Sequence, residues 1–133
     1  MVVVLHFLAI DCGNCVANLP HYNRWCDAYD ENRVKIIGIH RPETSRERSV
    51  EHVRAKLTKF DVTHPVLIDN DSKNWDAWAN QVWPSIYLID RAGFIRYWWY
   101  GELEYQGRGG NAWMRKRVNE LQQENPEVLL GSQ

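Results

Sequence analysis

Hydrophobic and polar positions divide the chain into segments of two kinds. Unbroken apolar runs are typical of strands buried on both faces, whereas apolar positions three or four residues apart are typical of helices with one buried face. The runs predict strands at residues 2–9, 34–39, 65–69, 85–90 and 94–100. The helical spacing predicts helices after Cys15, after Ser49, around Trp75 and Trp78, and through Met114, Val118 and Leu121.

The order of these elements indicates the fold class. Strands that alternate with helices form a parallel core joined by right-handed crossovers, so we expect an α/β domain with a central mixed sheet and helices on both faces. Residues 91–93 are short enough to close an antiparallel hairpin between the last two strands. Ser49 and Asn111 are in position to cap the helices that follow them. We predict one domain over residues 1–125 and a C-terminal tail at 126–133.

Length and composition exclude several classes of protein. The 133 residues suffice for one domain with a buried core, and three cysteines are too few for a disulfide scaffold. A net charge of −1 gives no basic surface for nucleic acid. The longest apolar run, residues 2–10, is much shorter than the ~20 residues that span a bilayer, and it lacks the basic segment and cleavage site of a secretion signal. We therefore expect a globular domain whose function depends on a few side chains.

Two of the cysteines, Cys12 and Cys15, stand at the junction of the first predicted strand and the first helix. The positive end of a helix dipole lowers the pKa of a thiol and supplies thiolate near neutral pH. Cys15, one helical turn later, is placed on the inward face and can close a disulfide with Cys12. One reactive and one shielded cysteine are what thiol–disulfide exchange requires.

Other uses of the pair fit the sequence less well. A zinc site needs four ligands, and the remaining candidates are Cys26 and five scattered histidines without a paired spacing, so we expect no metal site. A structural disulfide of so short a span would constrain the unfolded chain little. Cys26 lies at nearly the helical angle of Cys15 and is expected to be a buried thiol of the core, with a third redox cysteine as the alternative.

The sequence around the pair resembles a known family. Residues 2–15, VVVLHFLAIDCGNC, resemble the strand and W-C-x-x-C motif of the TlpA/ResA-like thiol-disulfide oxidoreductases, which have a thioredoxin-like fold and work outside the bacterial cytoplasm. Pro20 matches the proline that bends the family's first helix. Residues 64–105 resemble the family's inserted strand and helix, its cis-proline strand and the hairpin that follows. The similarity extends over roughly residues 2–121.

The resemblance implies an activity and a set of site residues. Cys12 would exchange with a protein disulfide or dithiol through a mixed disulfide that Cys15 resolves, with no metal or organic cofactor. An upstream thiol donor or acceptor would return the cysteine pair to its starting redox state. We expect the protein to be a monomer and, by the resemblance, to work outside the cytoplasm. The resemblance implies that Pro84 is the cis-proline that faces the pair and helps to orient the substrate. Trp83 departs from the family, which commonly has a smaller residue there, and would form an aromatic wall beside the cysteines. Gly13 and Asn14, between the cysteines, are also expected to orient the substrate, although they are neither of the family's best-known pairs.

Two positions near the motif differ from the thioredoxin pattern. His6 stands six residues before Cys12, where thioredoxin has a buried acid, and would relay the proton of Cys15; the alternative is a core histidine that donates to a backbone carbonyl. Asp11 occupies the place of the family's tryptophan. Its carboxylate should raise the pKa of Cys12 unless it points to solvent.

Two other functions remain open. The first is a peroxiredoxin-like peroxidase with Cys12 as the thiolate that reacts with peroxide, although Ala9 stands where that class has Thr or Ser. The second is a non-catalytic redox-sensing or docking module, in which closure of the cysteine pair reshapes a surface. The sequence leaves the direction of exchange open.

Overall fold

The computed structural model describes residues 1–125, which form a five-stranded sheet of order β3-β2-β1-β4-β5. Strands β1, β2 and β3 are parallel, and β4 is antiparallel to both β1 and β5. The mixed α/β sheet with a parallel core and an antiparallel hairpin is confirmed. The strands are β1 Val2–Leu8, β2 Val34–His40, β3 Val66–Ile68, β4 Ser85–Ile89 and β5 Ile95–Tyr100.

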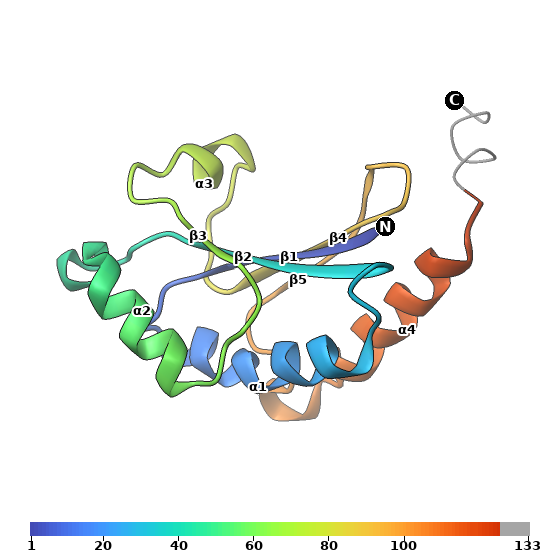
Figure 1. The fold of residues 1–133 in the computed structure, drawn as a ribbon, viewed down its shortest axis with the longest axis horizontal. Coiled ribbons are helices and arrows are strands. Elements are labelled where there is room, and N and C mark those ends of the chain that lie inside the picture. Colours follow the sequence, from blue (N-terminus) through green and yellow to red (C-terminus); the bar gives the residue numbers. More distant parts are fainter. Residues whose placement is uncertain (126–133) are drawn as a thin grey trace.

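The longer helices lie together against one face of the sheet, and one short helix lies on the opposite face (Figure 1). This arrangement follows from right-handed crossovers, because α1 and α2 connect successive parallel strands and therefore pass on the same side. The longer helices are α1 Gly13–Ala28, α2 Val50–Lys59 and α4 Gly110–Gln123, and the short one is α3 Lys73–Ala77. No helix within residues 1–125 has the length and apolar character needed to cross a membrane.

One of the two predicted helix caps is confirmed. Ser49 caps α2, since its hydroxyl accepts a hydrogen bond from the His52 backbone N–H at 3.2 Å. The expectation for Asn111 was wrong, because α4 begins after Gly109, whose φ of 72° is easily adopted only without a side chain. The Asn111 carboxamide instead accepts a hydrogen bond from Trp25 Nε1 at 2.7 Å and joins α4 to α1. The predicted tail at 126–133 lies outside the described residues.

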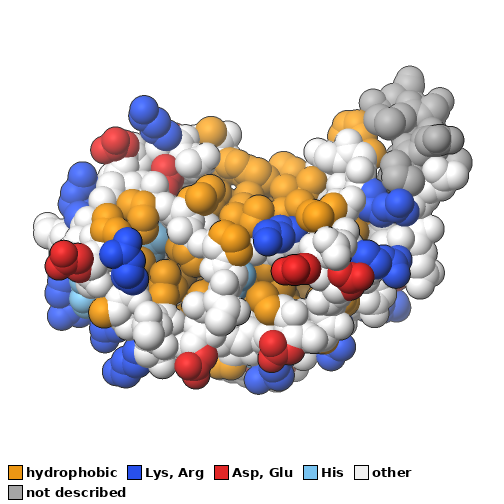
Figure 2. All heavy atoms as spheres, in the orientation of Figure 1, with side chains coloured by type: hydrophobic (Ala, Val, Ile, Leu, Met, Phe, Trp, Pro, Cys, Tyr) orange, Lys and Arg blue, Asp and Glu red, His pale blue; other side chains and the backbone are white. Residues whose placement is uncertain are grey.

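The main core lies between the sheet and the helices α1 and α4. It contains the inward residues of β1, β2 and β4 together with Cys15, Leu19, Tyr22, Trp25, Met114, Val118 and Leu121. A smaller cluster of Leu5, Phe7, Ile39, Trp75 and Tyr87 covers the other face of the sheet. Figure 2 shows hydrophobic side chains gathered in the middle of the view, between the lobe that carries α3 and the β4–β5 hairpin.

Candidate active site

The first cysteine of the pair is placed by the end of β1 and the start of α1. Cys12 is the N-cap residue of α1, with extended backbone at φ −80° and ψ 119°. Its backbone N–H donates to the Ala9 carbonyl at 3.0 Å, and its carbonyl accepts from the Val16 N–H at 3.0 Å. The first turn of α1 contains no acidic side chain, so no carboxylate within that turn competes with the sulfur for the unsatisfied N–H groups at the start of the helix.

The two thiols of the pair have opposite electrostatic environments. A hydrogen bond from the Cys15 thiol, together with the backbone N–H groups of Cys15 and Asn14, lowers the pKa of Cys12 to about 6 against the opposing effects of burial and Glu43. The same hydrogen bond and burial raise the pKa of Cys15. Cys15 is only 1% exposed, and its sulfur accepts the Ala9 N–H at 3.5 Å. Both cysteines are free thiols, so the structure is that of the reduced pair.

Asp11 is hydrogen-bonded to neighbouring side chains and is largely shielded from solvent. Its carboxylate accepts hydrogen bonds from Arg46 and His52 at 3.0 Å, and its side chain is 16% exposed. Burial raises the pKa of this carboxyl, but the hydrogen bonds from His52 and Arg46 outweigh burial and lower it overall. The expected rise in the pKa of Cys12 is therefore not found.

The structure describes the surroundings of each residue that is predicted to orient a substrate. The peptide bond between Trp83 and Pro84 is cis, as expected. Trp83 is fixed by a hydrogen bond from its Nε1 to the Arg41 carbonyl at 3.1 Å, and the Arg41 guanidinium lies 5.0 Å from the ring centre. Gly13 has no atom within 4 Å of the place where a Cβ would stand, and Asn14 lines an open hollow beside Gly101.

His6 is fully buried and pairs with another histidine. Its Nε2 lies 2.7 Å from Nε2 of His64, and its ring stacks on Tyr22 with the ring centres 4.0 Å apart. Burial, with a smaller contribution from His64, holds the pKa of His6 well below its usual value. Gly38 provides the space, since a Cβ there would stand 3.0 Å from the His6 ring. Within the described part of the chain, His6 makes no hydrogen bond to either cysteine of the pair.

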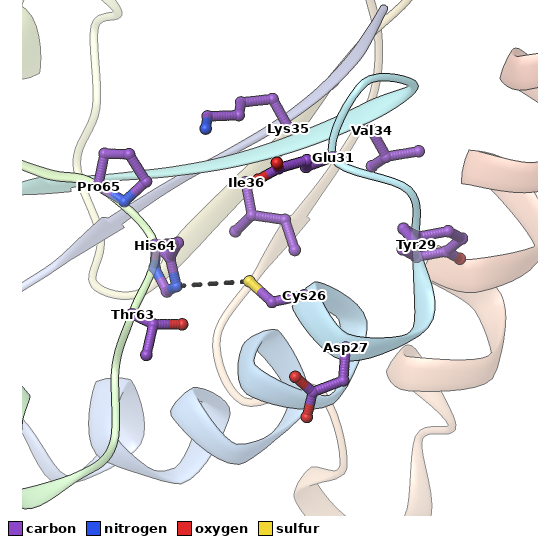
Figure 3. Close-up of a pocket in the computed structure, with 10 residues that line it drawn as sticks. All are labelled: Cys26, Asp27, Tyr29, Glu31, Val34, Lys35, Ile36, Thr63, His64 and Pro65. Atoms are coloured by element: carbon purple, nitrogen blue, oxygen red, sulfur yellow. Dashed lines mark hydrogen bonds between the residues drawn. The ribbon is translucent and has the colours of Figure 1, made fainter.

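Two features of this region were not anticipated. The sequence gives no reason to join His64 to His6, because 58 residues separate them. Cys26 is not a fully buried core thiol; it is half-buried and lines a cavity, with its sulfur 3.9 Å from Nδ1 of His64 (Figure 3). Over residues 1–125, no three His, Cys, Asp or Glu side chains are grouped so that they could hold a metal ion.

Comparisons with known proteins agree with the geometry. The model of the AhpC/TSA family matches residues 1–98. Protein DipZ of Mycobacterium tuberculosis is 34% identical over 104 residues, which are 78% of this chain and 15% of DipZ. Thiol-disulfide oxidoreductase YkuV of Bacillus subtilis is 26% identical over 118 residues, 89% of this chain and 75% of YkuV. The chain thus spans a small part of DipZ and most of YkuV.

Solved structures show the same fold. The crystal structure of a thiol-disulfide isomerase from Corynebacterium glutamicum superposes with a TM-score of 0.81 at 23% identity, covering 93% of this chain and 82% of that one. The thioredoxin-like fold expected from the sequence is confirmed, and so is the resemblance to thioredoxin-fold thiol-disulfide oxidoreductases.

Proposed function

Because the chain belongs to the AhpC/TSA family and is similar to a relative named thiol-disulfide oxidoreductase YkuV, we propose that it exchanges a Cys12–Cys15 dithiol with protein disulfides. The observation that carries this proposal is the contrast between the two thiols. The pKa of Cys12 is lowered to about 6, whereas Cys15 is buried and its pKa is raised. A thiolate attacks a disulfide, and a shielded thiol next to it resolves the product.

The reductive cycle follows from this arrangement. The Cys12 thiolate attacks one sulfur of the substrate disulfide, forms a mixed disulfide, and displaces the other sulfur as a thiolate that takes a proton from solvent. Cys15 then loses its proton and attacks Cys12 Sγ. A Cys12–Cys15 disulfide forms, the bond to the substrate breaks, and the second substrate sulfur leaves as a thiolate. Two electrons pass from the pair to the substrate, and an upstream dithiol returns them. The same steps in reverse oxidise a substrate dithiol.

The remaining site residues have supporting roles in this proposal. Pro84 and Trp83 form one wall of the place where an extended substrate chain approaches Cys12, supported by the fixed orientation of the Trp83 ring. Gly13 and Asn14 form the opposite side, supported by the open space around Gly13. His6 relays the proton of Cys15, supported by its burial as a neutral imidazole.

The setting of the reaction is part of the proposal. Its substrates are protein thiols and disulfides, as the name of the YkuV relative suggests. The proposal treats the chain as a monomer. A location outside the cytoplasm is supported by structural neighbours that include a secreted disulfide oxidoreductase of Mycobacterium tuberculosis. The peroxidase alternative has less support, because YkuV is named a thiol-disulfide oxidoreductase and not a peroxidase.

Reduction of insulin by dithiothreitol tests the proposal. The wild type should accelerate the reaction, and Cys12→Ser and Cys15→Ser should each abolish the acceleration. Thr58→Ala, on the exposed side of α2, is the matched control and should keep full activity. A wild-type protein without turnover would favour the docking module. Consumption of hydrogen peroxide that depends on Cys12 but not on Cys15 would favour the peroxidase.

A further inference from the structure

The four residues 9–12 form a turn that connects β1 to α1. The Cys12 N–H donates to the Ala9 carbonyl at 3.0 Å and closes this turn. The Ala9 N–H donates to the sulfur of Cys15 at 3.5 Å. Since Cys12 belongs to the 9–12 turn and Cys15 is hydrogen-bonded to it, the conformation of the turn determines how the two sulfurs lie relative to each other.

The two inner residues of the 9–12 turn are held by buried side chains from β2 and the segment that follows it. The Ile10 N–H donates to Nε2 of His40 at 3.0 Å, and the Asp11 N–H donates to Oε2 of Glu47 at 3.0 Å. His40 is the last residue of β2 and is fully buried, and Glu47 is only 1% exposed. Within residues 1–125, neither N–H donates to a backbone carbonyl, so the two side chains provide the acceptors that a neighbouring strand provides in a sheet.

The Glu47 carboxylate also binds the loop after β2. Its other oxygen, Oε1, accepts hydrogen bonds from the Glu43 N–H at 3.1 Å, the Thr44 N–H at 2.9 Å and the Thr44 hydroxyl at 3.0 Å. A buried carboxylate costs free energy unless hydrogen bonds satisfy it, and this one accepts four. Because both oxygens accept from backbone N–H groups, an amide in this place would turn its NH₂ group toward a donor.

His40 can hold the turn only as a neutral ring. Its Nε2 accepts a hydrogen bond only when the single proton of the imidazole is on Nδ1. Burial lowers the pKa of His40, although the charges of Glu47 and Asp11 oppose the effect of burial. The ring is therefore uncharged near neutral pH, and the acceptor that the Ile10 N–H requires is present there.

We propose that His40 and Glu47 are positioning residues for Cys12: they hold the 9–12 turn so that the Cys12 sulfur stays next to the Cys15 thiol and the N–H groups at the start of α1. This inference rests on the proposed exchange activity and adds two residues to its site. Both act through the backbone of the turn, and neither transfers electrons or protons.

The side chain of Asp11 is a weaker attachment of the same turn. Its carboxylate contacts Arg46 and His52 at 3.0 Å, but the Arg46 side chain is 69% exposed. Ion pairs in contact with water stabilise a structure little, because solvent screens the charges and the side chains lose entropy. The hydrogen bond from the Asp11 N–H ends on a carboxylate that is shielded from solvent, so it is expected to hold the turn more strongly.

Glu47→Gln tests this role without changing the size of the side chain. The amide oxygen is expected to stay with the three donors of Glu43 and Thr44, so the NH₂ group faces the Asp11 N–H and that hydrogen bond is lost. If Glu47 positions Cys12, the sulfur moves away from its donors, and the midpoint of Cys12 alkylation by iodoacetamide rises from about 6 to at least about 7. If Glu47 acted only through its charge, the midpoint would fall, because removal of a negative charge favours thiolate.

Asp90→Asn is the matched control, because Asp90 is also a buried carboxylate that accepts backbone N–H groups. It lies in the turn between β4 and β5, at the opposite end of β1 from Cys12. Its replacement should lower the free energy of unfolding in urea and leave the alkylation midpoint at about 6. All variants are made in a Cys26→Ser background, and the peptide that contains Cys12 is followed by mass spectrometry.

Two further measurements complete the test. His40→Leu removes the acceptor of the Ile10 N–H and should raise the midpoint as Glu47→Gln does. Hydrogen exchange of the wild type, followed by NMR, needs no variant. The amides of Ile10 and Asp11 should exchange at least about a hundredfold more slowly than in an unfolded chain, because buried side chains accept them.

The inference is overturned if the midpoint of Glu47→Gln or His40→Leu equals or falls below the wild-type value, or if the two wild-type amides exchange as in an unfolded chain. An equal rise in Asp90→Asn would also overturn it, since the shift would then reflect a general loss of stability. The exchange proposal fails separately: alkylation needs no turnover, so a wild-type protein that does not reduce insulin would remove the proposed activity without changing the alkylation midpoints.

Discussion

Replacing Cys15 by alanine removes the interaction that does most to lower the pKa of Cys12. The Cys15 thiol donates a hydrogen bond to the Cys12 sulfur, and this bond is the largest of the contributions that bring the pKa of Cys12 to about 6. Hydrogen bonds to a thiolate favour the charged form, so their loss raises the pKa. The backbone N–H groups of Cys15 and Asn14 remain in the variant and continue to favour the thiolate.

The expected size of the effect follows from these contributions. With a pKa of about 6, Cys12 is about nine-tenths thiolate at pH 7, whereas an ordinary thiol with a pKa of ~8.5 is only a few per cent thiolate. Since the backbone contacts remain in Cys15→Ala, we expect the titration of the Cys12 thiol in this variant to have its midpoint at a pH of roughly 7.5 to 8. Because the lowered pKa favours thiolate, the reactivity of wild-type Cys12 is nearly complete at pH 7 and is lost as pH falls through about 6.

Alkylation by iodoacetamide across a range of pH measures the midpoint directly. The experiment uses a Cys26→Ser background and follows the peptide that contains Cys12 by mass spectrometry. The midpoint is the appropriate quantity, because the intrinsic nucleophilicity of a thiolate rises with its pKa and partly offsets the change in rate. Cys15→Ser is the matched variant, since its hydroxyl retains a donor and should shift the midpoint less. A midpoint that stays near 6 in Cys15→Ala would refute the role assigned to the Cys15 thiol.

Two further predictions concern the packing that supports the site. In Gly110→Ala a Cβ would stand 2.5 Å from the Leu103 carbonyl oxygen, so we expect a loss of about 2–3 kcal/mol in the free energy of unfolding measured with urea. Gly13→Ala, which meets no atom within 4 Å, should show no such loss, and equal stabilities would contradict the packing argument. Asn18→Ala removes the acceptor of the buried Leu103 N–H and the donor to the Gly101 carbonyl, and should cost roughly 2–3 kcal/mol. If Asn18→Ala has the same free energy of unfolding as the wild type, water replaces both hydrogen bonds and the prediction is wrong.

Local pattern was enough to predict most of the elements. Continuous apolar runs and helical spacing depend on a few neighbouring residues, so β1, β2, β4 and β5 were predicted within one residue of their ends, and the three longer helices were located along the chain. The position of Cys12 and Cys15 at a strand–helix junction follows from the same local signals. The fold class could be predicted as well, because the order of elements restricts the possible connections.

Contacts between distant segments could not be predicted. Asn111 is a residue type that commonly caps helices, but Gly109 allows the turn that starts α4 two residues earlier, and the Asn111 side chain contacts Trp25 instead. The carboxylate of Asp11 is hydrogen-bonded by Arg46 and His52, which lie 35 and 41 residues further along the chain. The periodicity of hydrophobic residues along a sequence does not indicate which loop packs against which strand.

The sequence by itself determined the thioredoxin-like arrangement of strands and helices and the presence of a cysteine pair at the first helix. These properties depend on hydrophobic period and on the chemistry of adjacent residues, both of which can be read along the chain. Only the tertiary structure decided that Cys15 would lower the pKa of Cys12, and that His64 would meet His6 beside a cavity. Hydrogen bonds and burial depend on distances in space, which folding fixes between residues that the chain keeps far apart.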